Sequence, residues 1–123
     1  MIHGVGIDIV RVERIKEAVG KWGEKFLGRV FTGKEISRCY EKKDPFPSLA
    51  VRFAAKEALI KAVGSRLSAF TDIEILNDSH GKPFVRTSGK LEVFFRESSL
   101  RASQVSLSHE REYAIAFVVI ERS

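Results

Sequence analysis

The chain has 123 residues, of which 44% are hydrophobic and 30% charged, and its formal net charge is +5 at pH 7. This length fits one domain over positions 1–123, and the composition is that of a globular rather than a disordered protein. No apolar run approaches the ~20 residues of a membrane span, and MIHGVGIDIV lacks the features of a signal peptide. The single cysteine, Cys39, excludes an internal disulfide and fits a cytoplasmic protein. The basic charge predicts an anionic partner, which could be nucleic acid, an acidic protein or a phosphorylated small molecule.

The first part of the chain is predicted to be a strand followed by helices. Glycine alternates with β-branched residues over 2–10, which is typical of a strand. A helix should follow, because apolar residues recur at three- and four-residue steps: Val12, Ile15, Val19, Trp22 and Phe26. Thr32 and Glu35 form a capping box, which predicts a second helix over 33–43.

The rest of the chain is predicted to contain one long helix and then mainly strands. The sequence DPFP separates the second helix from a third over 48–63, which should end at Gly64. A hairpin is expected where DIEIL and KPFVR flank the turn NDSHG. After a short helix near 89–99, two strands close the chain as SQVSLSH and EYAIAFVVIE. Early helices and late antiparallel strands indicate an α+β domain, an antiparallel sheet packed with helices.

Asp8 lies in the middle of the first predicted strand, between Ile7 and Ile9. Burying a carboxylate without a partner is unfavourable, so we expect Asp8 to be paired, hydrogen-bonded or metal-bound. A nearby backbone amide would satisfy it as well as a metal would. Gly4 and Gly6 match a dinucleotide-binding fingerprint only weakly, because the third glycine and the adjoining helix are missing. They leave one strand face bare, so that something large can approach it.

The third predicted helix, RFAAKEALIKA, carries charges among apolar residues. Glu57 and Lys61 share one face, while Arg52 and Lys56 form a neighbouring row. One explanation is a surface ion pair between Glu57 and Lys61, worth ~0.3–0.5 kcal/mol. The apolar neighbours leave little of the helix facing solvent alone, so a second explanation is a divalent metal that carries a phosphate. Magnesium is typically held by one or two carboxylates and phosphate oxygens, and lysine neutralises remaining phosphate charge.

Two stretches together resemble the signature pair of the phosphopantetheinyl transferases: GIDIV at 6–10 and RFAAKEALIKA at 52–62. Weaker matches accompany them, namely Arg14 and Ile15, FTGKE, GKP and the closing SLSHEREYAIAFVV. The resemblance covers essentially the whole chain. Its short length is that of the small class of this family, the holo-acyl-carrier-protein synthases.

The resemblance implies a defined reaction. Such enzymes move the 4′-phosphopantetheine arm of coenzyme A onto a serine hydroxyl of an apo acyl carrier protein and release 3′,5′-ADP. In this family the acids that match Asp8 and Glu57 bind Mg²⁺ against the pyrophosphate, and Lys61 would contact the same phosphates. The serine proton is expected to go to a carboxylate, directly or through a metal-bound water, and Glu57 is our first choice. Asp8, Glu57 and Lys61 are therefore the expected catalytic residues.

The resemblance also implies contacts with coenzyme A, with Lys61 and five further positions: Arg52, Gly64, Ser65, Pro83 and His109. Without the family, a histidine at a strand end is more often structural. The chain departs from the family at Arg66, where members often have a glycine. This departure affects the expected path of the loop, although Arg66 could add a phosphate contact.

Arg14, Lys21 and Lys25 are spaced by seven and four residues and should form a ridge beside the first apolar stripe. A solvated helix face is the ordinary explanation of this spacing. The resemblance implies instead that this basic ridge docks an acidic carrier protein, since complementary charge steers such encounters. It also implies a homotrimer whose active sites lie between chains. One chain would then supply the two acids and Lys61, and its neighbour would supply nucleotide contacts such as His109.

Three rival functions remain open on the sequence. A nucleic-acid-binding module would explain the charge, but the chain has no aromatic signature of RNA recognition. A serine hydrolase is disfavoured because Ser106 and Ser108 should point to the strand face opposite His109, and there is no nucleophile elbow. A structural subunit would leave the two acids without a role. We therefore expect neither a nucleic-acid nor a membrane partner.

Overall fold

A computed structural model of the chain describes residues 1–64 and 69–123. The elements follow in the order β1 (Ile2–Arg11), α1 (Val12–Trp22), α2 (Glu24–Val30), α3 (Gly33–Tyr40), α4 (Phe46–Val63), η1 (Phe70–Asp72), β2 (Ile73–Asn77), β3 (Pro83–Thr87), α5 (Gly89–Glu97), β4 (Leu100–His109) and β5 (Tyr113–Arg122). Two antiparallel sheets form, one ordered β1-β5-β4 and the other made of β2 and β3. The α+β class and the hairpin predicted from the sequence are confirmed.

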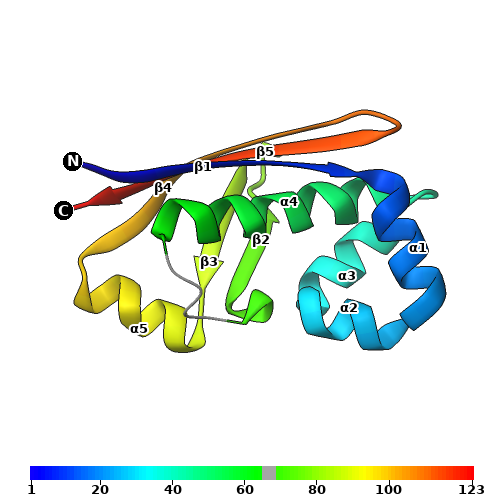
Figure 1. The fold of residues 1–123 in the computed structure, drawn as a ribbon, viewed down its shortest axis with the longest axis horizontal. Helices are drawn as coiled ribbons and strands as arrows, with labels where there is room; N and C mark the ends of the chain where they lie inside the picture. Colours follow the sequence, from blue (N-terminus) through cyan, green and yellow to red (C-terminus); the bar gives the residue numbers. More distant parts are fainter. Residues whose placement is uncertain (65–68) are drawn as a thin grey trace.

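Helix α4 lies along one face of the three-stranded sheet and is the centre of the domain (Figure 1). Helices α1, α2 and α3 gather at one end of the molecule, while α5 lies toward the other, where both termini also lie (Figure 1). The side of the sheet that faces α4 is buried, with Ala114, Ala116, Val118 and Ile120 of β5 fully inaccessible. The arrangement leaves α4 covered almost all round.

The bare face of β1 packs directly against α4. A Cβ added to Gly6 would lie 1.8 Å from the carbonyl oxygen of Ala58, and one added to Gly4 would lie 2.1 Å from that of Ala62. No side chain fits at such distances, so the two glycines allow the helix backbone to touch the strand directly. The large group expected at this face is therefore helix α4 itself.

The apolar stripe that predicted one helix after β1 is divided between two helices. The chain breaks at Gly23, whose φ of 55° is in the left-handed region that favours glycine. Val12 and Ile15 are buried as predicted, but Trp22, just before the break, is 55% exposed. The apolar stripe therefore predicted burial correctly for Val12 and Ile15 and wrongly for Trp22.

The capping box at Thr32 is confirmed: its side chain accepts from the Glu35 amide, and the Glu35 side chain accepts from the Thr32 amide. Helix α3 ends at Tyr40, three residues before the predicted end. Helix α4 begins at Phe46, two residues earlier than predicted, because Pro47 falls in its first turn, where proline is tolerated. Gly64 ends α4 in the left-handed conformation, as predicted. Across residues 1–64 and 69–123, no helix has the length and apolarity needed to cross a membrane.

Candidate active site

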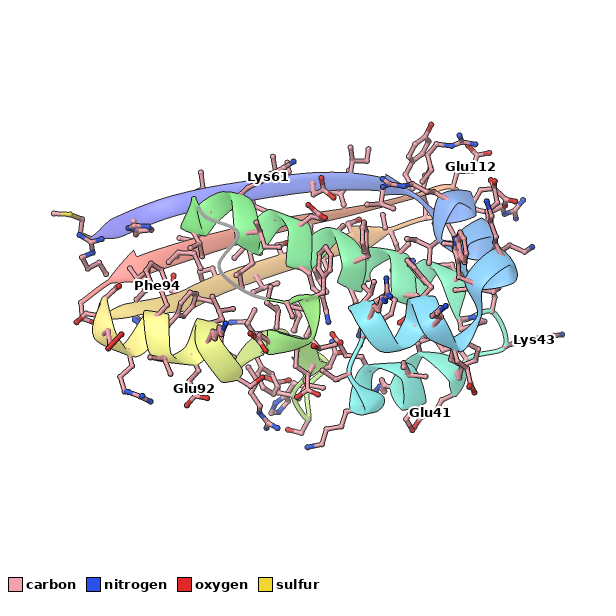
Figure 2. The ribbon with its side chains drawn as sticks, turned by 60° about the horizontal axis from the view of Figure 1, so that its bottom comes forward. Glu41, Lys43, Lys61, Glu92, Phe94 and Glu112 are labelled. Atoms are coloured by element: carbon pink, nitrogen blue, oxygen red, sulfur yellow. The ribbon has the colours of Figure 1, made fainter. Side chains whose placement is uncertain are left out.

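Asp8 projects from β1 on the side covered by α4, two residues beyond the glycine that touches the helix. Its Oδ1 lies 3.1 Å from the Nζ of Lys61, and the same ammonium donates to the carbonyl oxygen of Ile7 at 3.1 Å. Figure 2 shows Lys61 beside β1 at the edge of the sheet. The Asp8 side chain is 17% exposed and that of Lys61 is 55% exposed. The expectation that Asp8 is paired is thus confirmed, and its partner is a cation open to solvent.

Glu57 lies one turn before Lys61 on α4, so the two side chains share one side of the helix. Its neighbour Ala58 is the residue whose carbonyl oxygen abuts Gly6 of β1. Glu57 is half-buried. Lys61 therefore binds Asp8 directly and lies one helical turn from Glu57. We call Asp8, Glu57 and Lys61 the acid cluster.

The acid cluster fits a hard divalent cation by its donor chemistry. The described part of the chain contains no group of three or more His, Cys, Asp or Glu side chains that could hold a metal. Two carboxylates from different elements are nevertheless what Mg²⁺ ordinarily takes from a protein, because it keeps water and binds substrate phosphate for its other positions. Lys61 brings a compact positive charge to the same place.

A cavity of about 320 Å³ opens on the other side of α4. Three of the predicted coenzyme A contacts, Arg52, Pro83 and His109, share it. Its walls come from α3, α4, the β2–β3 hairpin and the end of β4, and its lining residues are Arg38, Lys42, Ser48, Val51, Arg52, Asn77, Gly81, Pro83, Leu107 and His109. Among these residues there are three cations and no acid, so we call it the basic cavity. An anionic ligand fits its charge.

Arg52 is 5% exposed and is bound mainly within the protein. Its Nε donates to the carbonyl oxygen of Ile75 at 3.2 Å, and its Nη1 donates to the carbonyl and hydroxyl oxygens of Ser48 at 3.2 and 2.6 Å. Its Nη2 donates to Oδ1 of Asn77 at 2.9 Å. These bonds engage four of the five N–H groups of a guanidinium. Arg52 therefore offers a ligand its charge and a single donor, not the bidentate fork of a free arginine.

His109 faces the basic cavity from the end of β4. Burial lowers the pKa of its imidazole below the ordinary value of 6.5, and the charges of Lys42 and Arg52 lower the pKa further. The folded chain therefore favours the neutral imidazole over the imidazolium. Ser106 and Ser108 pair with Phe117 and Ile115, on the sheet face away from α4. The predicted separation of these serines from His109 is confirmed, and it removes the basis for a serine hydrolase.

Lys56 is not a phosphate ligand, although it shares a row with Arg52. It is fully buried, and its Nζ lies 2.6 Å from Oε1 of Glu35, which is also fully buried. The same ammonium donates to the carbonyl oxygens of Val30 at 2.6 Å and Phe70 at 3.1 Å. Burial lowers the pKa of Lys56, and the Glu35 carboxylate opposes that shift. Lys56, which was not among the predicted site residues, therefore serves the packing of the domain.

Two cavity residues, Arg38 and Lys42, were not among the predicted site residues. Both are exposed and line the basic cavity from the side of α3. Together with Lys34 they recur at four-residue steps, which would place them on one side of the helix predicted over 33–43, although α3 ends before Lys42. That spacing was a signal, but nothing in the sequence shows that this side faces Arg52. Two further predicted coenzyme A contacts are Gly64 and Ser65. Gly64 ends α4 just beyond Lys61, and Ser65 lies outside the described residues.

The acid cluster and the basic cavity lie toward opposite edges of the sheet. Asp8 is on β1 and His109 on β4, and β5 lies between these strands. With a strand spacing of about 4.8 Å, β1 and β4 are roughly 10 Å apart. One chain thus presents two separate groups of functional side chains.

Comparison with known proteins identifies the family. A family model described as the 4′-phosphopantetheinyl transferase superfamily matches residues 4–118. The chain belongs to the 4′-phosphopantetheinyl transferase superfamily. It is 47% identical over 123 residues to the holo-[acyl-carrier-protein] synthase of Halothermothrix orenii, with 98% of each chain covered.

Solved structures agree with this assignment. The holo-[acyl-carrier-protein] synthase of Neisseria meningitidis has a TM-score of 0.90 and 39% identity, with 99% of this chain and all (100%) of that chain covered. The synthase of Bacillus anthracis, solved in complex with CoA (3′,5′-ADP), has a TM-score of 0.82 and 38% identity, with 100% and 99% covered. Within the superfamily, the chain therefore belongs with the holo-[acyl-carrier-protein] synthases.

The basic ridge of this phosphopantetheinyl transferase spans two helices, because the break at Gly23 places Lys25 on α2. The guanidinium carbon of Arg14 lies 5.7 Å from the ring centre of Phe53, one turn before Glu57. Arg14 therefore lies against α4, one helical turn before Glu57. At the far end of the ridge, a hollow of about 310 Å³ is lined by Trp22, Lys25, Phe26 and Arg29.

The sheet face away from α4 exposes large apolar side chains. Val5, Ile7 and Ile9 of β1 are 54–59% exposed, and Ile115 and Phe117 of β5 are each 39% exposed. They lie side by side, since Ile7 pairs with Phe117 and Ile9 with Ile115. Exposed apolar patches are commonly interaction surfaces, so this face is a candidate for one.

Proposed function

We propose that the chain transfers the 4′-phosphopantetheine group of coenzyme A to a serine hydroxyl of an apo acyl carrier protein. The observation that carries this proposal is full-length membership in the family together with an acid cluster in the signature positions. In the transfer, the serine oxygen forms a bond to the phosphorus that bears pantetheine. The bond from that phosphorus to the oxygen bridging it to the nucleotide breaks, and 3′,5′-ADP leaves with that oxygen.

Each residue of the acid cluster has a part in this reaction. Asp8 and Glu57 would hold Mg²⁺, which supplies neutralisation of the charge on the pyrophosphate. The Lys61 ammonium stabilises the negative charge that develops on the leaving phosphate. To reach that phosphate, Lys61 gives up its ion pair with Asp8. Glu57 takes the serine proton as the oxygen attacks.

The basic cavity would take the nucleotide end of coenzyme A. Its cations Arg38, Lys42 and Arg52 match the phosphate groups in charge, and Pro83 offers an apolar surface for the base. Arg52 and His109 retain the roles that the family resemblance implies, with Arg52 limited to one donor. Gly64, which ends α4, would line the pantetheine, as the family resemblance implies.

The direct test is intact-mass measurement of a carrier protein. Apo acyl carrier protein, coenzyme A and Mg²⁺ incubated with the enzyme should yield carrier that is heavier by one phosphopantetheine. Chelation of the metal with EDTA should stop the gain, and added Mg²⁺ should restore it. Carrier that keeps its mass under all three conditions would refute the transfer.

We further infer that the active enzyme is a homotrimer with its sites between chains. The exposed apolar face would be covered by neighbouring copies, and the acid cluster of one chain would meet the basic cavity of the next. This arrangement accounts for two functional groups on opposite edges of one sheet. A shared active site brings together what a single chain keeps apart.

Mixing two inactive variants tests the shared site. Asp8→Ala chains lack an acid, and His109→Ala chains lack a cavity residue, so each variant alone should be inactive or weakly active. After joint refolding in equal amounts, about a quarter of the sites should combine an intact acid cluster with an intact His109, since each half is intact with a chance of one half. A mixture that shows only the summed activity of the separate variants would contradict the shared site.

The affinity for nucleotide should depend on pH through His109. A bound phosphate offsets the cations that lower the pKa of this histidine, so binding should raise the pKa and take up a proton. We expect the affinity ratio of wild type to His109→Gln for 3′,5′-ADP to increase as the pH falls from about 7.5 to about 6. Calorimetry on both proteins at each pH measures this ratio, and protonation of the ligand itself cancels from it.

The same histidine affects stability with the opposite sign. Without ligand, the folded chain holds the His109 proton more weakly than the unfolded chain does, because the folded pKa is lowered. Its contribution to stability is therefore complete above pH 6.5 and is lost as the pH falls below that value. In the binding experiment, the ratio of wild-type to His109→Gln affinity for 3′,5′-ADP is the deciding quantity. If the protein binds 3′,5′-ADP and this ratio does not change with pH, His109 has no part in nucleotide binding.

The basic ridge would dock the acidic carrier protein. Lys25→Glu should raise KM for the carrier about tenfold and leave KM for coenzyme A unchanged, because it reverses a charge at the docking surface only. Lys90→Glu makes the same change on exposed α5, away from the ridge, and is the matched control. Equal effects of the two substitutions would show that total charge, and not the ridge, attracts the carrier.

A further inference from the structure

Asn77, the last residue of β2, connects Arg52 to the turn that follows. Its Oδ1 accepts from Nη2 of Arg52 at 2.9 Å, and its Nδ2 donates to the carbonyl oxygen of Gly81 at 3.0 Å. A guanidinium can only donate and a backbone carbonyl can only accept. The side-chain amide of Asn77 therefore has one orientation that satisfies both neighbours.

Arg52 is a fixed point for this connection. Its Nε and Nη1 groups are bound to Ile75 and Ser48, which hold the plane of the guanidinium from β2 and from α4. Ile75 is held from its other side as well, since its amide donates to Oε2 of the buried Glu35 at 2.9 Å. The guanidinium position therefore does not depend on Asn77.

The turn, in contrast, is compact but has few ties to the rest of the cavity. Oδ1 of Asp78 accepts from the amides of His80 and Lys82 at 2.8 and 2.9 Å, and the Asp78 amide donates to the Lys82 carbonyl oxygen at 2.9 Å. These bonds lie within the turn and keep its shape. The bond from Asn77 to Gly81 instead joins the turn to the fixed arginine.

We propose that Asn77 is a positioning residue that sets the width of the basic cavity. By tying Gly81 to Arg52, it holds the turn that ends at Pro83, where β3 begins opposite Asn77, at a fixed separation from the cationic wall. This inference rests on the proposed function, in which the cavity takes the nucleotide end of coenzyme A. Removing Asn77 lets the turn move as a unit and weakens nucleotide binding. Asp8, Glu57 and Lys61 lie on β1 and α4, which the turn does not hold, so the chemical step continues at its normal rate once coenzyme A is bound.

Asn77→Ala provides the primary test, with binding and turnover measured separately. We expect the Kd for 3′,5′-ADP and the KM for coenzyme A to rise together by about tenfold, while kcat stays within about twofold. The thermal midpoint should change little, because Asn77 is half-buried at the end of a strand. Ser79→Ala is the matched control, because it removes a polar group of the same turn whose hydroxyl contacts His80 and not the cavity.

A double-mutant cycle separates positioning from direct contact. If Asn77 acts by placing Pro83, the substitution Pro83→Ala should weaken 3′,5′-ADP binding in the wild type and have little further effect in Asn77→Ala. Additive effects would mean that Asn77 touches the nucleotide itself, which overturns the positioning role. Unchanged binding in Asn77→Ala, or a parallel loss of kcat and thermal stability, would overturn it as well. Wild-type protein that binds no 3′,5′-ADP would refute the proposed function and this inference together, whereas the other outcomes leave the function standing.

Discussion

Glu57→Gln is expected to reduce phosphopantetheine transfer by at least about 1,000-fold, the largest effect we foresee for a single substitution. Glutamine keeps the size of the side chain and one acceptor oxygen, but it removes the negative charge. The acid cluster then has one carboxylate for the metal and no group to take the serine proton. Intact mass of the carrier protein over time measures the transfer, and the rise in thermal midpoint on adding Mg²⁺ measures metal binding.

Glu92→Gln is the matched control for this experiment. It makes the same chemical change at Glu92, an exposed acid of α5 (Figure 2). Glu92 forms a helix-surface pair with Arg96 at 3.9 Å. Transfer and the response to Mg²⁺ should both be normal in this protein. Asp8→Asn should behave like Glu57→Gln in the metal assay. Normal transfer by Glu57→Gln would remove Glu57 from both its metal and its base role.

Glu35→Gln is expected to lower the free energy of unfolding by about 3–5 kcal/mol, because it leaves the buried Lys56 ammonium without its counter-charge. Two carbonyl oxygens remain as acceptors for that ammonium, but neither carries a full charge. Lys56→Met should be destabilising for the converse reason, since it isolates the Glu35 carboxylate. Chemical denaturation of the single and double variants measures these values, and the double variant should lose much less than the sum of the two.

The pH dependence of Glu35→Gln has a definite sign. Losing the carboxylate lowers the pKa of Lys56 further, so the folded chain binds this proton more weakly than the unfolded chain. The variant should therefore regain stability as the pH rises toward 10.5, the ordinary pKa of lysine. Glu92→Gln again serves as the control, because an exposed pair contributes less than about 1 kcal/mol. A loss below 1 kcal/mol in Glu35→Gln would show that the buried pair is not needed for stability.

Local features of the fold could be predicted because each rests on residues close together in sequence. The capping box at Thr32 and the stop at Gly64 are set by one helical turn of chain. The hairpin follows from two alternating stretches on either side of a turn. The break at Gly23 was missed because glycine within an apolar stripe is tolerated in many helices, and only its positive φ shows that the chain turns there.

The sequence proposes the residues of the candidate site but does not predict how they are arranged. Helical spacing places Glu57 and Lys61 together, and family resemblance brings Asp8 to them. Which neighbouring cation turns inward depends on distant partners: Lys56 meets Glu35, 21 positions away, and Arg52 meets Ile75, 23 positions away. Helical periodicity within α4 predicts neither of these contacts, because both partners lie far away in the sequence. Periodicity also does not predict the strand order β1-β5-β4, which separates the acid cluster from the basic cavity.

The glycines of β1 have a consequence for how the acid cluster is built. Helix α4 rests on β1 through main-chain atoms at Gly4 and Gly6. The spacing between the two elements that carry Asp8 and Glu57 is therefore set by a backbone contact, which no side-chain rotation can change. An added methyl at Gly6 would push α4 away from β1 and so separate Asp8 from Glu57 without altering either side chain. The distance between the two acids therefore depends on two positions that carry no functional group at all.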